Sequence, residues 1–199
     1  MKKTSIRPLL FSDISQVVTL HRDVLGTTLN AQIGSKYLFE LYLLILKDTN
    51  NSAGWVAVSS DGEVIGFLTV TRNLFELEKK IHAEIGIVAK IRAAWYLLRH
   101  PSKIMVLISR SKFSRYLRQL PCHQYPTILT IGINHNIQKQ GLGTRLIAAS
   151  DSYFVSYNVL RYFVDTEVIN QQAGDFYSRL GFNKFGEYEG NVLFEKEFF

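Results

Sequence analysis

The feature that most constrains the fold of this chain is an apolar run that leads through a glycine-containing turn into a helix-like pattern. The run is 128–133 (ILTIGI), the turn is 138–143 (QKQGLG), and the pattern carries Leu142, Leu146, Ile147 and Tyr153. We therefore predict a strand, a turn and a helix start. The first N–H groups of a helix have no internal acceptor, and the helix dipole favours an anion there. Because glycine also lets the backbone approach phosphate oxygens, the pattern indicates a pyrophosphate site.

The periodicity of the other segments predicts alternating strands and helices. Strands are expected at 4–10, 55–59, 64–71, 127–133, 162–168, 182–188 and 191–198. Helices are expected from about residue 13 and at 35–46, 85–98, 102–120, 140–157 and 173–180. We predict an α/β fold with a mixed, partly antiparallel sheet flanked by helices, in a single domain over 1–199. Its helical insertion covers about 74–120, with a helical pair as its main part.

The composition of the chain bears on its cellular compartment and on whether it binds a metal ion. The apolar stretches all end well short of the ~20 residues that a membrane span needs. Lys2 and Lys3 are not followed by the apolar region of a signal peptide. Cys122 is the only cysteine, so it forms no intramolecular disulfide and no cysteine metal cluster. We expect a cytoplasmic protein without a metal ion.

The positive charge of the chain is concentrated in one segment. Residues 72–118 hold eleven Lys or Arg and three Glu, whereas the other residues together are slightly acidic. A basic segment favours anionic partners such as nucleotides, phosphosugars, lipid head groups or RNA. The charge is unevenly spread and no RNA-reading motif is present, so we do not expect a nucleic acid as partner.

Two motifs resemble those of the GNAT superfamily of N-acetyltransferases. That family has a Gln/Arg-x-x-Gly-x-Gly/Ala motif between its fourth strand and the following helix, which here is 138–143. It also has an Asn after its fifth strand and then Ala-x-x-Phe-Tyr-x-x-x-Gly-Phe. The matching residues here are Asn170, Ala173, Phe176, Tyr177, Gly181 and Phe182. The resemblance is close over 127–198 and weaker over 4–71, and residues 72–126 depart from it.

The resemblance implies that acetyl-CoA is the co-substrate. The turn amides would hold its pyrophosphate, and its amide-rich arm would pair with the backbone edge of 131–133, as a peptide adds to a strand. The expected coenzyme-binding residues are Ile131, Gly132, Ile133, Gln138, Lys139, Gln140, Gly141, Leu142, Gly143, Thr144 and Asn170. Three of these also allow a structural interpretation: Gly132 as a packing glycine or bulge, Lys139 as a surface charge and Asn170 as a helix N-cap.

By the same resemblance, Tyr177 is the general acid that protonates the leaving thiolate. It shares a helix face with Ala173, Phe176 and Leu180, and a core tyrosine is the alternative interpretation. Family members often place a general base, a Glu, on the fourth strand, where this chain has Thr130. The candidate bases are therefore Asp165 and Glu167, followed by Glu84, His123 and His135, or a chain of water molecules. His21 lies near the loop that shapes the acceptor site, where a partly buried polar residue is the simpler interpretation.

The basic insertion allows three interpretations. Its helices pack their apolar faces on the sheet, or they form a wall that binds an anionic acceptor, or they attach the protein peripherally to an anionic membrane through 79–118. For the chain as a whole we predict direct transfer of acetyl, in a ternary complex, to a primary amine of a small molecule such as an amino sugar or a nucleotide-linked amino sugar. The alternatives are an inactive CoA-binding regulatory module and a peripheral membrane-binding protein. The acceptor and the oligomeric state are not indicated by the sequence.

Overall fold

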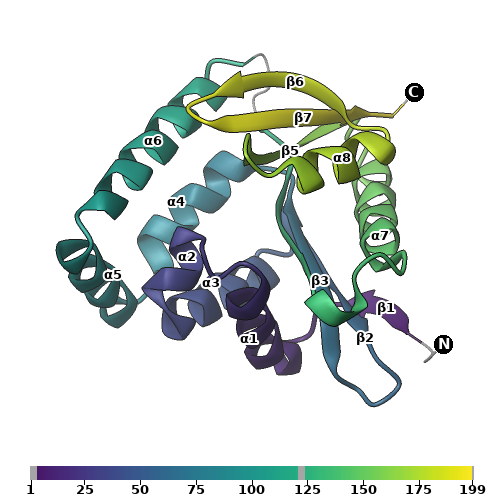
Figure 1. The fold of residues 1–199 in the computed structure, drawn as a ribbon, viewed down its shortest axis with the longest axis horizontal. Coiled ribbons are helices and arrows are strands. Elements are labelled where there is room, and N and C mark those ends of the chain that lie inside the picture. Colours follow the sequence, from purple (N-terminus) through teal and green to yellow (C-terminus); the bar gives the residue numbers. More distant parts are fainter. Residues whose placement is uncertain (1–3, 121–123, 199) are drawn as a thin grey trace.

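The computed structural model describes residues 4–120 and 124–198, and their centre is a seven-stranded mixed sheet. Its strands are β1 (Ser5–Pro8), β2 (Ser52–Val58), β3 (Val64–Thr71), β4 (Thr127–Ile133), β5 (Arg161–Glu167), β6 (Asn183–Tyr188) and β7 (Asn191–Glu197). Their order in space is β1-β2-β3-β4-β5-β7-β6. Every neighbouring pair is antiparallel except β4 and β5, which are parallel (Figure 1). The predicted mixed sheet is confirmed.

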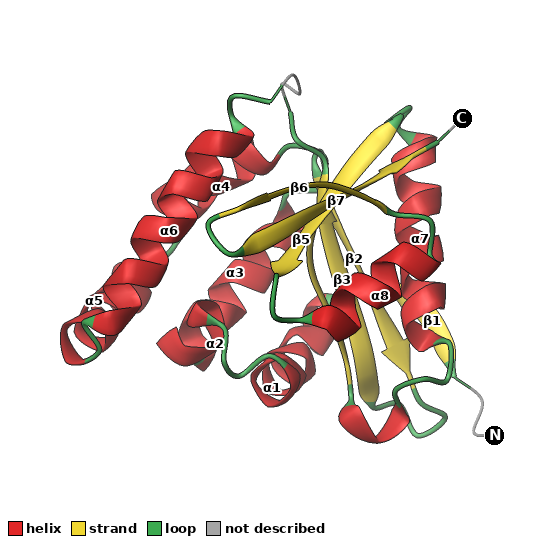
Figure 2. Ribbon diagram, turned by 45° about the horizontal axis from the view of Figure 1, so that its top comes forward, coloured by secondary structure: helices red, strands yellow, loops and turns green. Residues whose placement is uncertain are grey.

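Helices cover both faces of this sheet, as Figure 2 shows. One face carries α1 (Ile14–Val24), α2 (Leu29–Ile33), α3 (Ser35–Lys47), α4 (Leu74–Glu84), α5 (Ile87–Arg99) and α6 (Ser102–Leu117). The other carries α7 (Leu142–Ser156) and α8 (Gln171–Arg179). Alternate strand residues enter separate cores, so that Phe67 packs among α1 and α3 while its neighbour Leu68 packs with α7.

The insertion differs from its sequence prediction in the number of helices. It contains α4, α5 and α6, whereas we predicted a helical pair that began at residue 85. The buried residues of α4, Phe75 and Leu77, are followed in the sequence by mostly polar and charged residues, so α4 shows little apolar periodicity. The five-residue helix α2 also escaped prediction, because it is too short to show a period.

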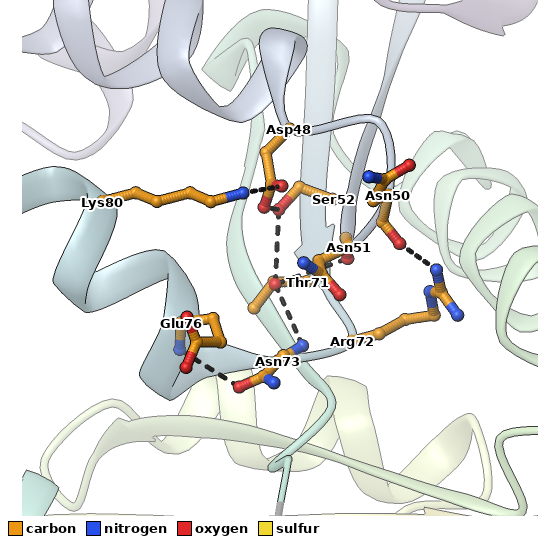
Figure 3. A network of polar contacts seen from close by, with 9 residues as sticks. All are labelled: Asp48, Asn50, Asn51, Ser52, Thr71, Arg72, Asn73, Glu76 and Lys80. Atoms are coloured by element: carbon orange, nitrogen blue, oxygen red, sulfur yellow. Dashed lines mark hydrogen bonds and ion pairs between the residues drawn. The ribbon is translucent and has the colours of Figure 1, made fainter. Parts of the chain in front are cut away.

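A buried polar network fixes the start of the insertion to the sheet (Figure 3). The Lys80 ammonium of α4 lies 2.6 Å from Asp48, a buried carboxylate at the end of α3. The Ser52 hydroxyl on β2 donates to the second oxygen of Asp48 at 3.0 Å. Thr71 Oγ1, at the end of β3, accepts the Asn73 N–H at 3.2 Å, and Asn73 in turn caps α4. The network therefore sets the direction in which the chain leaves β3.

The insertion reaches the core at its start, in α4, and again at its far end. Phe113 and Leu117, near the end of α6, are buried in a cluster with Phe75 and with Phe163 of β5. The only buried residue of α5, by contrast, is Ala89. The interpretation in which the insertion helices pack their apolar faces on the sheet is therefore wrong for α5 and for the first half of α6.

Candidate functional site

The sheet opens between its two central parallel strands. β4 and β5 share a single pair of ladder partners, Thr127 with Phe163, and the Phe163 N–H donates to Pro126 O at 2.9 Å. Beyond this point the two strands separate, so the second half of β4 has no strand partner on that side. Such an open edge lies where the sequence analysis expects the arm of acetyl-CoA.

Backbone alternation shows which groups of β4 face the opening. The Asn134 N–H, just after β4, donates to Ile65 O on β3 at 3.0 Å. The N–H groups of consecutive strand residues point to opposite edges. Ile133 and Ile131 lie one and three residues before Asn134, so their N–H groups point away from β3 and toward β5. Two of the residues predicted at this edge thus present unpaired N–H groups to the opening.

The turn after β4 leads into α7, whose first backbone N–H groups receive no hydrogen bond acceptor from an N-cap side chain. Gly141 is the N-cap of α7 and supplies no side-chain acceptor. The first α7 amide with a partner is that of Arg145, which donates to Gly141 O at 3.1 Å. In the part of the chain that the structure describes, the amides of Leu142, Gly143 and Thr144 have no backbone or side-chain acceptor. These donors fit an anionic ligand such as a pyrophosphate.

The three glycines singled out by sequence have different structural reasons. Gly141 has a φ of +77°, which glycine adopts without strain, and a Cβ there would meet nothing within 4 Å. A Cβ on Gly143 would lie 2.9 Å from the Phe176 ring, so this glycine lets α7 approach α8. A Cβ on Gly132 would lie 2.6 Å from the Phe67 ring. Gly132 therefore has the packing role that the sequence analysis gave as an alternative.

The polar residues of the turn divide between local contacts and solvent. The Gln138 amide donates to Ile133 O at 3.4 Å and lies 3.3 Å from His135 Nδ1, which ties the turn to the end of β4. Lys139, with a left-handed φ of +63°, and Gln140 are exposed. Both are therefore accessible to a ligand at the helix start.

Asn170 makes the helix cap that was one of its two predicted roles. Its side-chain oxygen accepts the Ala173 N–H at 3.1 Å at the start of α8. Asn170 is exposed and lies three residues after the end of β5, so it stands at the carboxyl end of the opening. Its role as a coenzyme contact stays a prediction.

Tyr177 is buried on α8, between the opening and the core. Its ring packs 5.4 Å from both Phe176 and Phe182. The hydroxyl makes no hydrogen bond to any residue in 4–120 or 124–198, which leaves it available to a bound molecule. Burial, and then the nearby negative charge of Asp165, raise the pKa of Tyr177 well above its usual value of 10. The phenol therefore keeps its proton at any physiological pH.

The two candidate bases lie on the same face of β5, opposite α7 and α8. Part of Asp165 reaches solvent, but the protein around it limits its hydration and raises the pKa of its carboxyl. The Arg110 cation of α6 acts against this rise. Burial raises the pKa of Tyr37 on α3, and Arg110 partly opposes that rise as well. Asp165 is thus within electrostatic reach of both Arg110 and Tyr177. Glu167, which is exposed like Asp165, is the last residue of β5.

A buried polar chain leads from α1 to β4, and sequence analysis did not find it. His21 is 3% exposed, and its Nδ1 lies 2.6 Å from the Tyr42 hydroxyl, while its Nε2 lies 3.5 Å from Thr28 Oγ1. Burial raises the pKa of Tyr42, and the nearby Thr130 partly opposes this rise. The chain therefore leads toward Thr130, the position where the resembled family often has its Glu. The only sequence signal was the polar His21 on an apolar helix face.

We expect the buried His21 to make the protein less stable in mild acid. Burial lowers its pKa from 6.5 to about 4, so the unfolded chain takes up a proton at a pH where the folded chain stays neutral. Stability contributed by the neutral ring is complete above pH 6.5 and is lost as the pH falls toward 4. Urea unfolding should show a loss of about 2 kcal/mol between about pH 7.5 and about pH 5. A His21→Gln variant that retains the whole pH dependence would contradict this assignment.

The other candidates lie elsewhere or outside the description. Glu84 ends α4, and His135 is exposed in the turn after β4. Cys122 and His123 lie outside the described residues. Within the described ranges, no three His, Cys, Asp or Glu side chains gather as a possible metal site. No helix there is long and apolar enough to cross a bilayer.

Solved structures with the same fold include acetyltransferases. PaiA N-acetyltransferase from Thermoplasma acidophilum, in complex with coenzyme A, has a TM-score of 0.66 at 13% identity, with 98% of this chain and 99% of that chain covered. Arabidopsis thaliana NAA60, in complex with a bisubstrate analogue, has a TM-score of 0.58 at 20% identity, with 98% of each chain covered. A glucosamine N-acetyltransferase region of a fungal multi-domain β-N-acetylglucosaminidase has a TM-score of 0.57 at 12% identity. The match covers 94% of this chain and 18% of the fungal one.

Sequence comparison gives the family directly. No curated protein sequence matches this chain. The profile of the acetyltransferase (GNAT) family matches residues 23–182, which include the turn at 138–143 and Tyr177. The match covers most of the chain and agrees with the fold and with the open edge of β4. The chain therefore belongs to the acetyltransferase (GNAT) family and is an N-acetyltransferase.

Proposed function

We propose that this single-domain enzyme transfers acetyl from acetyl-CoA to the primary amine of a small molecule in the cytoplasm. The observation that carries the proposal is the open edge of β4, which leads at one end to the unpaired amides of α7 and passes Tyr177. The unpaired amides suit the pyrophosphate, and the open edge suits the amide-rich arm of the coenzyme.

Each step of the transfer has a candidate group in this chain. Asp165 accepts the proton of the incoming ammonium, and its raised pKa brings it closer to neutral pH than an ordinary carboxyl. The Ile133 N–H, which points into the opening, donates to the oxyanion of the tetrahedral intermediate. Tyr177 gives its proton to the leaving thiolate. We favour Asp165 over Glu167 as base because only Asp165 is in electrostatic contact with Tyr177.

Simultaneous binding of both substrates is the route we propose. A bisubstrate analogue combines parts of two substrates, and NAA60, which shares this fold, was captured with one. An amino sugar is one acceptor class to test, since a glucosamine N-acetyltransferase region also shares the fold. The face of β5 that holds Asp165, together with α1, α2 and Arg110, would surround the acceptor.

The catalytic proposal is tested by thiol release from acetyl-CoA with a panel of amino sugars, nucleotide-linked amino sugars, small amines and amino acids. We expect at least one amine to stimulate release, with intersecting double-reciprocal plots as the mark of a ternary complex. Titration calorimetry with coenzyme A is the companion measurement. Heat of binding without any stimulated release would favour a regulatory module, an alternative supported by Thr130 standing where a Glu is common. No heat at millimolar coenzyme would overturn both.

A further inference from the structure

Helix α5 presents an apolar face to solvent. Ile87, Ile91, Trp95 and Leu98 follow one another at helical spacing, so they share a face. Ile87 is 68% exposed, Trp95 57% and Leu98 76%. Ala89, the only buried residue of α5, lies on the opposite side. The side of α5 that faces the protein is thus the side of Ala89 and not the apolar face.

The apolar surface continues into the first half of α6. The five consecutive residues from 104 to 108 are all exposed and all apolar: Ile104, Met105, Val106, Leu107 and Ile108. Together with the exposed face of α5 they form what we call the α5–α6 surface. In Figures 1 and 2, α5 lies at the outer end of the molecule, away from the strands, and α6 runs from it back toward β6 and β7. A cluster of this size on the outside of a chain marks an interaction site.

The charged residues of α5 and α6 are all cations, and the acidic Glu189 contacts α6 only beyond the apolar run, at Ser109 and Lys112. Lys90 lies on one flank of the α5 apolar face, and Arg92 and Arg99 lie on the other. None of the three forms an ion pair with any residue in 4–120 or 124–198. Arg99 instead lies 5.0 Å from the Trp95 ring. The sequence contains no Asp or Glu from residue 85 to residue 120.

We propose that the α5–α6 surface docks the protein on an anionic lipid bilayer. Apolar side chains would enter the boundary between head groups and acyl chains, while the flanking cations would meet the anionic head groups. A second copy of this chain would bring its own cations against these, so the charges favour lipid over self-association. The proposal is independent of the acetyl transfer proposed above.

The bilayer would lie beside the acceptor side of the enzyme. The Tyr96 hydroxyl of α5 donates to Gln32 of α2 at 2.8 Å, and the Gly86 N–H donates to Glu40 of α3 at 2.8 Å. The docking helix is therefore tied to the elements that would surround the acceptor. Because the polar network of Figure 3 fixes α4, the insertion holds the α5–α6 surface in one orientation to the sheet.

The first test is sedimentation of the full-length protein with vesicles. We expect binding to vesicles of equal parts phosphatidylglycerol and phosphatidylcholine at about 0.05 M salt, weakened at about 0.5 M because salt screens the cations. Vesicles of phosphatidylcholine alone should bind about tenfold more weakly or not at all. Failure to bind the anionic vesicles, or equal binding to both kinds, overturns the proposal.

Two matched variants locate the surface. Leu98→Asp places a carboxylate in the α5–α6 surface, and Leu160→Asp makes the same change at a leucine of similar exposure (72%) between α7 and β5. We expect Leu98→Asp to weaken vesicle binding about tenfold or more and Leu160→Asp to leave it unchanged. Both should release thiol from acetyl-CoA with a water-soluble amine at the rate of the unmodified protein. An equal effect of the two variants on vesicle binding overturns the assignment.

If Leu98→Asp lowers the thermal stability of the protein, a variant that changes only charge tests the same surface. Arg92→Gln with Arg99→Gln keeps the apolar face, and we expect it to weaken binding to anionic vesicles severalfold. Sedimentation velocity tests the competing occupant. A dimer that Leu98→Asp dissociates, in a protein that does not bind vesicles, would assign the surface to self-association and overturn the proposal.

Discussion

Replacing Tyr177 by Phe should lower kcat about 100-fold at neutral pH and leave the affinity for acetyl-CoA within about twofold. The phenol is the only group on α8 placed to protonate a thiolate in the opening, and its hydroxyl is committed to no other residue described. Phe keeps the ring that packs against Phe176 and Phe182, so the change removes the proton donor and little else. Steady-state kinetics and titration calorimetry measure the two quantities separately.

Tyr162→Phe is the matched control for this result. Tyr162 is a second buried tyrosine of the same core, and its hydroxyl donates to Asp151 at 2.6 Å, away from the opening. We expect Tyr162→Phe to cost about 1 kcal/mol of stability and to leave kcat unchanged. If Tyr177→Phe retains full kcat, or if the two variants lose kcat alike, Tyr177 is not the acid.

A second large effect is expected from a negative charge at the helix start. Gly141→Asp would place a carboxylate beside the amides of α7 that we assign to the pyrophosphate. Repulsion between the two anions over a few ångströms should weaken acetyl-CoA binding by about 1.4 kcal/mol or more, which is about tenfold. Because a Cβ at Gly141 meets nothing within 4 Å, the substitution disturbs no packing.

Gly62→Asp controls for the backbone strain in that experiment. Gly62, in the turn between β2 and β3, has a φ of +83°, and a Cβ there also meets nothing within 4 Å. Both variants should therefore lose a similar amount of stability, about 1 kcal/mol or somewhat more. Only Gly141→Asp should lose coenzyme affinity, as measured by calorimetry. Equal coenzyme affinities in the two variants would contradict the assignment of the pyrophosphate to the amides of α7.

The second half of the fold was predictable because its signals are local. The apolar run of β4 and the glycine turn directly adjoin the helix they start, and the structure places β4 at the predicted residues, 127–133. The N-cap interaction of Asn170 also spans only three residues. Such short-range patterns determine the local backbone conformation, so they can be read without knowledge of the tertiary structure.

The contacts that were missed join residues far apart in the chain. His21 meets Tyr42 across 21 positions, and their link to Thr130 is longer still. No local sequence pattern around His21 or Tyr42 predicts that the two side chains meet. The α5 period likewise predicted an apolar face correctly, but a period does not state what covers the face. The structure shows that none of the residues it describes covers this face.

The separation of β4 from β5 has a mechanical consequence. The centre of a sheet is ordinarily its most firmly held part, yet here the strands on either side of the opening are joined by one ladder pair. The two halves of the sheet therefore depend for their cohesion on α7 and α8 on one face and on the end of α6 on the other. A molecule whose amides filled the seam would act as an additional strand and couple the two halves.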